Sequence, residues 1–299
     1  MGEGDNEGMP GRNVVRANIV AVTPGARSER RDRLAGEEPM EIRAGGMSQE
    51  PVEVAVTMRT PGHDFELATG FLYNEGLITE GDVTRVSYCD VGSRPPVEPR
   101  DPDPDGDHSQ FNVVTVRTRN DFDPSSLRRN FFMTSSCGIC GKASLDQLEG
   151  MCHPVESDLR VPDAVISALP ERLRSSQSLF EATGGLHAAG IFRPDGTADL
   201  VREDIGRHNA LDKAIGAKLL AGELPLAGRI IAVSGRASYE LVQKCLAAGA
   251  PIMCAVSAPS SLAVETAGRF GLTLIGFLRG ESFNIYSHPE RVVSATGIR

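Results

Sequence analysis

Hydrophobic residues follow different patterns in the two halves of the chain. In the first half they alternate with polar residues, which is typical of half-buried strands. Over residues 51–60, one side of such a strand would carry Val52, Val54, Val56 and Met58. Similar patterns predict strands over residues 13–22, 83–91 and 111–119.

A helical spacing interrupts these strands at residues 61–78. One face of the helix would carry Phe65, Ala68, Phe71 and Leu72. Asp64 has the short acidic side chain that is typical of an N-cap, so we expect the helix to begin there.

In the second half the hydrophobic residues form continuous runs at residues 229–235, 251–258 and 272–278. The stretches between them, 238–249 and 261–271, have helical patterns and end at glycines suited to a C-cap. Strands that alternate with helices in this way are adjacent and parallel, and continuous runs are typical of strands covered on both faces. Upstream, a turn signal at 194–196 predicts a hairpin of residues 186–192 and 198–204, followed by a helix over 207–222.

These elements predict an α/β protein with two domains. We expect a smaller mixed α+β domain at residues 38–160 and a three-layer αβα domain at residues 161–299. Residues 1–37 show little periodicity outside the strand at 13–22 and are expected to be mostly flexible. The stretch 92–109 is rich in proline and aspartate, which predicts a disordered insertion.

Composition limits the classes of protein that the chain can belong to. Its 299 residues are 40% hydrophobic and 24% charged, as in ordinary globular proteins. The net charge of −9 argues against a nucleic-acid partner, although it allows one local anion pocket. We expect no membrane contact, because no hydrophobic run approaches the roughly 18 residues of a membrane helix. The N-terminus does not resemble a signal peptide, so we expect the protein to be cytoplasmic.

Six cysteines are too few for a disulfide scaffold, yet Cys137 and Cys140 lie two residues apart, each followed by a glycine. A structural zinc site needs four ligands, and the nearest additional ones, Cys152 and His153, are adjacent in sequence. A thioredoxin-like pair would open a helix directly after a strand, whereas this pair lies in a glycine- and serine-rich loop, residues 134–142.

Sulfur carriage fits this loop better than zinc or dithiol redox chemistry does. A persulfide carrier needs an exposed, mobile thiolate, and the nearby Lys142 would favour its formation. The second cysteine could relay the sulfur or release it by forming a disulfide. The remaining cysteines, Cys89, Cys245 and Cys254, lie in predicted strands or helices and are expected to be small core residues.

Small-residue loops follow two of the predicted parallel strands, at residues 234–238 and 257–261. Such loops open helices at the carboxyl edge of the sheet, where free backbone N–H groups and the helix dipole favour phosphate. The candidate residues are Ser234, Gly235, Arg236 and Ser257, with His187, Arg207 and His208 as further members of the pocket wall. Ordinary helix capping would also explain the serines.

Several stretches in series resemble the formate dehydrogenase accessory sulfurtransferases, the FdhD family. They are ELATGFLYNEGLI, SSCGICGKASL, TGGLHAAGIF, REDIGRHNALDK, VSGRASYELVQKCLAAGAPI and GESFNIYSHPERV. The resemblance runs from about residue 38 to the end and leaves out the insertion at 92–109.

The resemblance implies that the protein accepts sulfur from a cysteine desulfurase. The sulfur would pass to the molybdenum bis(molybdopterin guanine dinucleotide) cofactor before that cofactor enters the catalytic subunit of formate dehydrogenase. Cys137 and Cys140 match the persulfide-bearing pair. The resemblance also implies a homodimer that binds guanine nucleotide, with GDP as a mimic of the cofactor. The cofactor-contacting segment would comprise Phe283, Asn284, Ile285, Tyr286, Ser287 and His288.

The resemblance further implies that the second domain is similar to the cytidine deaminase fold. A zinc deaminase needs His-x-Glu and a second pair of cysteines. The stretch His187-Ala188-Ala189 has no glutamate at the third position, so we expect neither deamination nor a bound metal. A non-catalytic chaperone that only holds the cofactor remains an alternative of another class.

Overall fold

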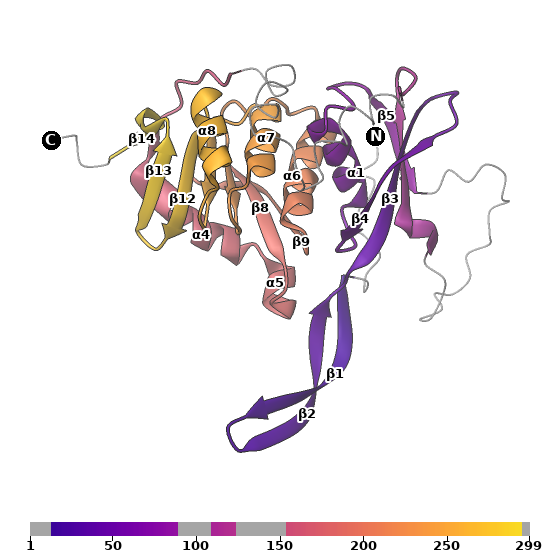
Figure 1. The fold of residues 1–299 in the computed structure, drawn as a ribbon, viewed down its shortest axis with the longest axis vertical. Coiled ribbons are helices and arrows are strands. Elements are labelled where there is room, and N and C mark those ends of the chain that lie inside the picture. The colour runs from indigo at the N-terminus through magenta and orange to yellow at the C-terminus, as the bar shows by residue number, and fades with distance from the viewer. Residues whose placement is uncertain (1–12, 89–108, 124–153, 295–299) are drawn as a thin grey trace.

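The computed structural model describes residues 13–88, 109–123 and 154–294. These residues form a four-stranded and a six-stranded sheet with helices between and around them, together with two smaller two-stranded sheets (Figure 1). The mixed α/β class predicted from the sequence is confirmed. The cysteine loop at 134–142 lies outside the described residues, as does the predicted insertion at 92–109 except for its last residue.

The four-stranded sheet has the order β4-β3-β6-β5. Its strands are β3 (Glu38–Gly46), β4 (Val52–Arg59), β5 (Val83–Tyr88) and β6 (Val113–Thr118), and η1 (Ser109–Asn112) precedes β6. The helix α1 (Asp64–Asn74) covers one face, where Ile42, Leu67 and Val114 are fully buried. The helix begins at the expected place, but its N-cap is His63, in a left-handed conformation, and Asp64 is the first helical residue.

The six-stranded sheet has the order β13-β12-β11-β10-β8-β9. Its strands are β8 (His187–Phe192), β9 (Ala198–Asp204), β10 (Ile230–Val233), β11 (Ile252–Ala255), β12 (Thr273–Arg279) and β13 (Ser282–Ser287). As predicted, β8 and β9 form a hairpin, and β10, β11 and β12 are parallel neighbours.

Helices cover both faces of this sheet. On one face lie α6 (Arg207–Ala221), α7 (Tyr239–Ala247) and α8 (Ser261–Arg269), and on the other lies α4 (Asp163–Ser175). The short α5 (Ser178–Thr183) leads into β8. A small parallel pair, β7 (Val161–Pro162) and β14 (Val292–Val293), and the turn η2 (Pro289–Arg291) complete this half. Both faces are fully buried at the centre of the sheet, which explains the continuous hydrophobic runs.

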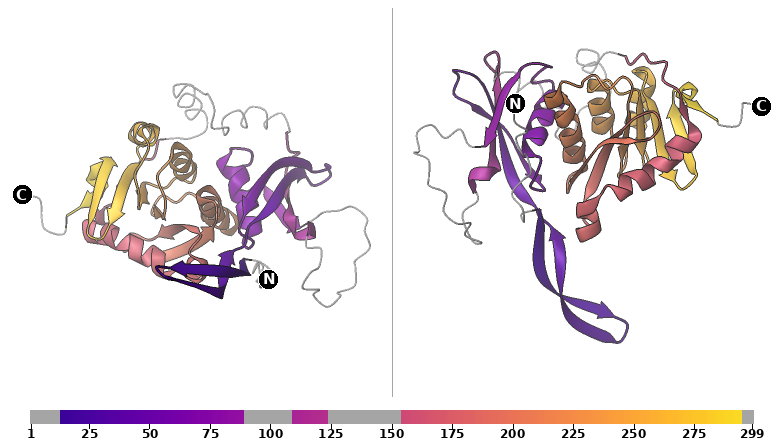
Figure 2. Two further views of the ribbon diagram at one scale, coloured as in Figure 1. Left: turned by 60° about the horizontal axis from the view of Figure 1, so that its bottom comes forward. Right: turned by 180° about the vertical axis from the view of Figure 1, so that it is seen from behind.

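The first strands form an arm that projects away from both sheets (Figure 2). β1 (Val14–Thr23) and β2 (Ala26–Ala35) pair along ten residues each. The prediction that residues 24–37 are flexible is therefore wrong for most of them. β2 is rich in charged residues and has no hydrophobic alternation, so only its backbone pairing with β1 and the turn at Gly25, with φ of 83°, define it.

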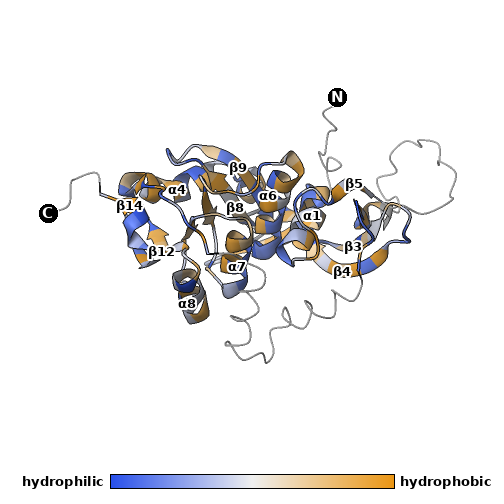
Figure 3. Ribbon diagram, turned by 90° about the horizontal axis from the view of Figure 1, so that it is seen from above, coloured by the Kyte–Doolittle hydropathy of each residue, from blue (hydrophilic) through white to orange (hydrophobic). Residues whose placement is uncertain are grey.

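The two sheets are joined through α1 and α6, which lie side by side between them (Figure 3). The helices approach closely at Gly70 and Gly216, where a side chain on either glycine would overlap the backbone of the other helix. Charged groups lie buried around this contact. The Nζ of Lys244 lies 2.8 Å from Oδ1 of Asp212, and the amide of Asn74 donates to the same oxygen at 2.7 Å.

Candidate functional site

The cysteines fall into two groups. Cys137 and Cys140, the predicted sulfur carriers, lie outside the described residues, and so do Cys89 and Cys152. Cys245 in α7 and Cys254 in β11 are fully buried, and burial raises the pKa of both thiols far above its usual value. These two thiols are unreactive core residues, as predicted.

The predicted small-residue loops meet at the carboxyl edge of the six-stranded sheet. The N–H of Ser257, after β11, donates to the carbonyl of Gly235, after β10, at 3.2 Å. The N–H of Phe277 in β12 donates in turn to the carbonyl of Ser257 at 3.2 Å. The Ser234 hydroxyl accepts a hydrogen bond from the N–H of Ala188 at 2.9 Å and so serves to pair β10 with β8. These backbone contacts produce one continuous edge that runs from β8 to β13.

One end of this edge carries cationic and imidazole groups. A side chain at Gly235 would lie 3.6 Å from Nδ1 of His187 and 3.7 Å from Cδ of Arg207, so the three residues enclose one small space. Arg207 is in the first turn of α6, and its Nε is buried with no hydrogen-bond partner among the described residues. His208, next to it, has Nε2 at 3.3 Å from Oγ of Ser238. Arg236 lies in the same loop as Gly235 and is exposed.

The start of α6 at this end is suited to an anion. The N-cap residues of α6 and α7 are Gly206 and Ser238, and neither makes a side-chain capping hydrogen bond. By contrast, Ser260 caps α8 by accepting a hydrogen bond from Ala263 N–H at 3.2 Å. At the start of α7, however, the Glu240 carboxylate accepts from its own backbone N–H and lies 3.9 Å from Nε2 of His208. The first N–H groups of α6 have no capping side chain, and together with Arg207 they favour an anion at that helix start.

The two histidines of this pocket are held neutral at pH 7. Burial, and then the charge of Arg207, lower the pKa of His187, which Asp204 only partly opposes. Burial, Arg207 and Lys244 lower the pKa of His208. An anion placed between them would offset the effect of Arg207 and favour protonation of both rings.

Anion binding is therefore expected to strengthen as the pH falls from 7.5 to 5.5. The free histidines have depressed pKa values, so a bound phosphate would be accompanied by proton uptake at mildly acidic pH. Calorimetric titrations with pyrophosphate across this range measure the effect. A His187→Gln, His208→Gln protein is the control, and equal pH dependence in the control and the parent would contradict the expectation.

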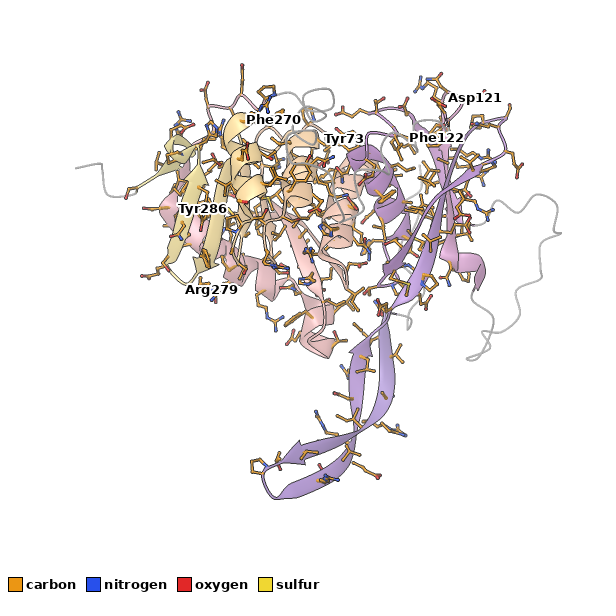
Figure 4. All side chains as sticks on the ribbon, viewed as in Figure 1. Tyr73, Asp121, Phe122, Phe270, Arg279 and Tyr286 are labelled. Atoms are coloured by element: carbon orange, nitrogen blue, oxygen red, sulfur yellow. The ribbon has the colours of Figure 1, made fainter. Side chains whose placement is uncertain are left out.

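The other end of the edge is aromatic. A side chain at Gly276 would lie 2.9 Å from Cδ of Pro259 and 3.1 Å from Cε2 of Tyr286, so the glycine allows the tyrosine ring to pack closely against the backbone of β12. The amide of Asn284 lies 3.5 Å from the Tyr286 hydroxyl. Figure 4 shows Tyr286 on the β12–β13 pair, and Arg279 beyond it at the end of β12.

Phe277 joins this end of the site and was not predicted. Ile275 and Leu278 both pack in the core on the α4 side, so the irregular pairing between them turns Gly276 and Phe277 away from that core. Phe277 has a φ of 52° and is 42% exposed, an unfavourable conformation for an aromatic residue. In the sequence it ends a hydrophobic run and resembles any buried strand residue; the preceding glycine is the only signal.

The six predicted residues at 283–288 are not brought together. Tyr286 and Asn284 face the edge described above, whereas Phe283 and Ile285 pack on the opposite face of the sheet, against the α4 side. Ser287 and His288 lie farther along β13, beside the start of β12. There the Ser287 hydroxyl donates to the carbonyl of Leu272 at 2.6 Å, and the His288 carbonyl accepts from the hydroxyl of Thr273. The last two residues therefore hold the sheet together.

Within residues 13–88, 109–123 and 154–294, no three His, Cys, Asp or Glu side chains lie close enough together to hold a metal ion. No helix in the same ranges is both long and hydrophobic enough to cross a membrane.

The structure defines an open α/β sheet whose loops and helix starts gather along its carboxyl edge. The chain belongs to the FdhD/NarQ family, whose model matches residues 35–293.

Curated relatives agree with this assignment. A protein named "Sulfur carrier protein FdhD" from Streptomyces coelicolor is 46% identical over 288 residues, which cover 94% of this chain and 96% of the relative. A protein of the same name from Saccharolobus solfataricus is 43% identical over 283 residues, covering 94% and 99%. The crystal structure of a protein from Desulfotalea psychrophila, described as a formate dehydrogenase accessory protein, has a similar fold. Its TM-score is 0.70 at 24% identity, with 94% of this chain and 99% of that chain covered.

Proposed function

We propose that this protein is a sulfurtransferase that carries sulfur to the molybdenum bis(molybdopterin guanine dinucleotide) cofactor before the cofactor enters formate dehydrogenase. The observation that carries the proposal is the continuous edge that runs from His187 and Arg207 to Tyr286. One end of this edge favours an anion and the other end is aromatic, which matches the diphosphate and the base of a guanosine diphosphate moiety. The names of the relatives, sulfur carrier proteins, support the sulfur chemistry.

Each end of the edge has a distinct role in this proposal. The diphosphate binds between Arg207, His187 and the start of α6, where N–H groups and positive charge meet it. The guanine base stacks beside Tyr286 and Phe277, because aromatic side chains offer flat surfaces to a purine. The strained backbone of Phe277 is then explained as a means of presenting its ring to the base.

The sulfur step uses the paired cysteines. The Cys137 thiolate attacks the outer sulfur of the desulfurase persulfide, so the outer sulfur moves to Cys137 and the desulfurase thiol leaves. The Cys140 thiolate then attacks the inner sulfur of the Cys137 persulfide. A disulfide forms, and the outer sulfur leaves with two electrons as a ligand for molybdenum. A cellular thiol restores the two cysteines.

The proposal also includes the compartment, the partners and the oligomeric state in which this sulfur transfer takes place. Reducing conditions in the cytoplasm keep both cysteines available as thiols. A cysteine desulfurase and the catalytic subunit of formate dehydrogenase are the proposed partners. We further propose a homodimer, and the exposed Val20 and Val22 of the arm, at 58% and 67% exposure, support a second chain that covers them.

We also propose that the chain divides into two domains and that the second is of the cytidine deaminase type. The mixed six-stranded sheet, with α6 and α7 starting at one edge, supports this. The relation would concern the fold alone, because no metal-binding group lies among the described residues.

The sulfur-carrier role is tested by loading the protein with labelled sulfur. The protein, a cysteine desulfurase and cysteine labelled at sulfur are mixed, and protein-bound label is measured. We expect label on the parent, and at least a tenfold loss in a Cys137→Ala protein, because its thiolate forms the persulfide. Cys245→Ala is the matched control and should retain label, since its thiol is buried. If Cys137→Ala and Cys140→Ala proteins both keep full label, the carrier role is wrong.

If a cysteine-free protein still supports formate dehydrogenase maturation, the chaperone alternative is favoured.

A further inference from the structure

The anion end of the edge is held in place by the other half of the molecule. Asn209, in the first turn of α6, donates from its amide nitrogen to the carbonyl of Met58 in β4 at 2.8 Å. The same nitrogen donates to Oδ1 of Asp204 at 3.1 Å. The Thr57 hydroxyl donates to the amide oxygen of Asn209 at 3.4 Å. One side chain thereby ties the start of α6 to the end of β9 and to a strand of the four-stranded sheet.

A second set of contacts fixes the base of this turn. Oδ2 of Asp204 accepts from the N–H of Thr60 at 3.1 Å and lies 2.7 Å from Nζ of Lys213. Lys213 also donates to the Thr60 carbonyl at 2.8 Å, and the N–H of Ile205 donates to the Thr60 hydroxyl at 3.1 Å. Asp204, Thr60 and Lys213 are almost fully buried, so this base is rigid. Asn209 extends the connection from the rigid base to the partly exposed turn.

The direction of the Arg207 side chain depends on the position of the first turn of α6. Its Nε has no hydrogen-bond partner among the described residues, so this nitrogen does not anchor the guanidinium. The position of its backbone, two residues from Asn209, decides where the side chain reaches. We propose that Asn209 is a positioning residue, which holds the first turn of α6 against β4 and thereby aims Arg207 and the helix N–H groups at a diphosphate. This inference rests on the proposed nucleotide site.

The loss of Asn209 should weaken only the binding of the phosphate part of the ligand. Replacing Asn209 with alanine removes the contacts to Met58, Thr57 and Oδ1 of Asp204. It leaves the contacts of Asp204 Oδ2 with Thr60 and Lys213, and the aromatic end of the edge, in place. Since a misplaced charged hydrogen bond weakens binding by roughly five- to tenfold, pyrophosphate and GDP should each bind Asn209→Ala that much more weakly. Guanosine, which has no phosphate, should bind as it does to the parent.

Calorimetric titrations of the full chain with pyrophosphate, GDP and guanosine test the proposal. Asn74→Ala is the matched control: it removes a different amide contact to α6, the hydrogen bond that Asn74 at the end of α1 donates to Asp212, one turn farther along α6. It should lower the melting temperature and leave all three affinities within about twofold. Thr57→Val is a second variant with a smaller expected loss, and it serves if Asn209→Ala does not fold.

The outcomes separate the two proposals. A loss for pyrophosphate and GDP but not for guanosine, in Asn209→Ala and not in Asn74→Ala, supports the positioning role. Unchanged pyrophosphate binding in Asn209→Ala and Thr57→Val, or equal losses in Asn74→Ala, overturns it while the nucleotide site stands. If the parent binds neither GDP nor pyrophosphate, the nucleotide site is wrong and the positioning role falls with it.

Discussion

A Gly216→Ala protein is expected to lose about 3 kcal/mol or more of its free energy of unfolding. Helix propensity alone predicts the opposite, because alanine in a helix is more favourable than glycine by about 1 kcal/mol. At Gly216, however, the added methyl group would overlap the carbonyl of Glu66 in α1, and backbone atoms cannot move aside as a flexible side chain can. Separating the helices would also disturb the buried charges between them.

The matched control is Gly268→Ala in α8, where an added methyl group meets nothing within 4 Å. This protein should be as stable as the parent or more stable by up to about 1 kcal/mol. Urea unfolding followed by circular dichroism measures both. If both substitutions change the free energy of unfolding in the same direction, the close contact of α1 and α6 does not hold the two sheets together as described.

An Arg207→Gln protein is expected to bind GDP between roughly 10- and 100-fold more weakly than the parent, since a charged hydrogen bond to phosphate contributes about 1.5–3 kcal/mol. Glutamine keeps the aliphatic stem and some hydrogen-bonding capacity of the side chain, but it is shorter and removes the charge. Arg207 is partly buried at a helix start, so its loss should change the stability of the protein little.

Calorimetry with GDP measures the affinity, and Arg236→Gln is the comparison. Arg236 is exposed in the neighbouring loop, where solvent screens its charge, so its loss should cost less than that of Arg207. A weaker effect of Arg207→Gln than of Arg236→Gln would mean that the anion lies over the loop after β10 rather than at the start of α6.

The sequence predicted the second half of the fold well because its signals are local and mutually consistent. Continuous hydrophobic runs, glycines at helix ends and a turn at 194–196 together define β8 to β12 and the helices between them. The first strand of the arm, β1, was predicted, but β2 was missed because it has no hydrophobic face against a core. Its ten residues pair with β1 through the backbone, which leaves no periodic pattern in the sequence.

The candidate site was predicted in part for a similar reason. Loops that follow parallel strands must meet at one edge, so the proximity of Gly235 and Ser257 could be foreseen from the order of elements. The position of Phe277 could not, because an irregular pairing with β13 reverses the side to which its ring points. The same is true of Asn209, whose partners Thr57 and Met58 are about 150 residues away in the chain.

The site at the carboxyl edge is tested most directly by titrating GDP into the intact full-length protein in a calorimeter, with guanosine and pyrophosphate as separate ligands. We predict one GDP per chain, bound more tightly than either fragment, because the base and the diphosphate occupy opposite ends of one continuous edge. No heat with GDP, or a GDP affinity no greater than that of guanosine, would contradict the proposed nucleotide site.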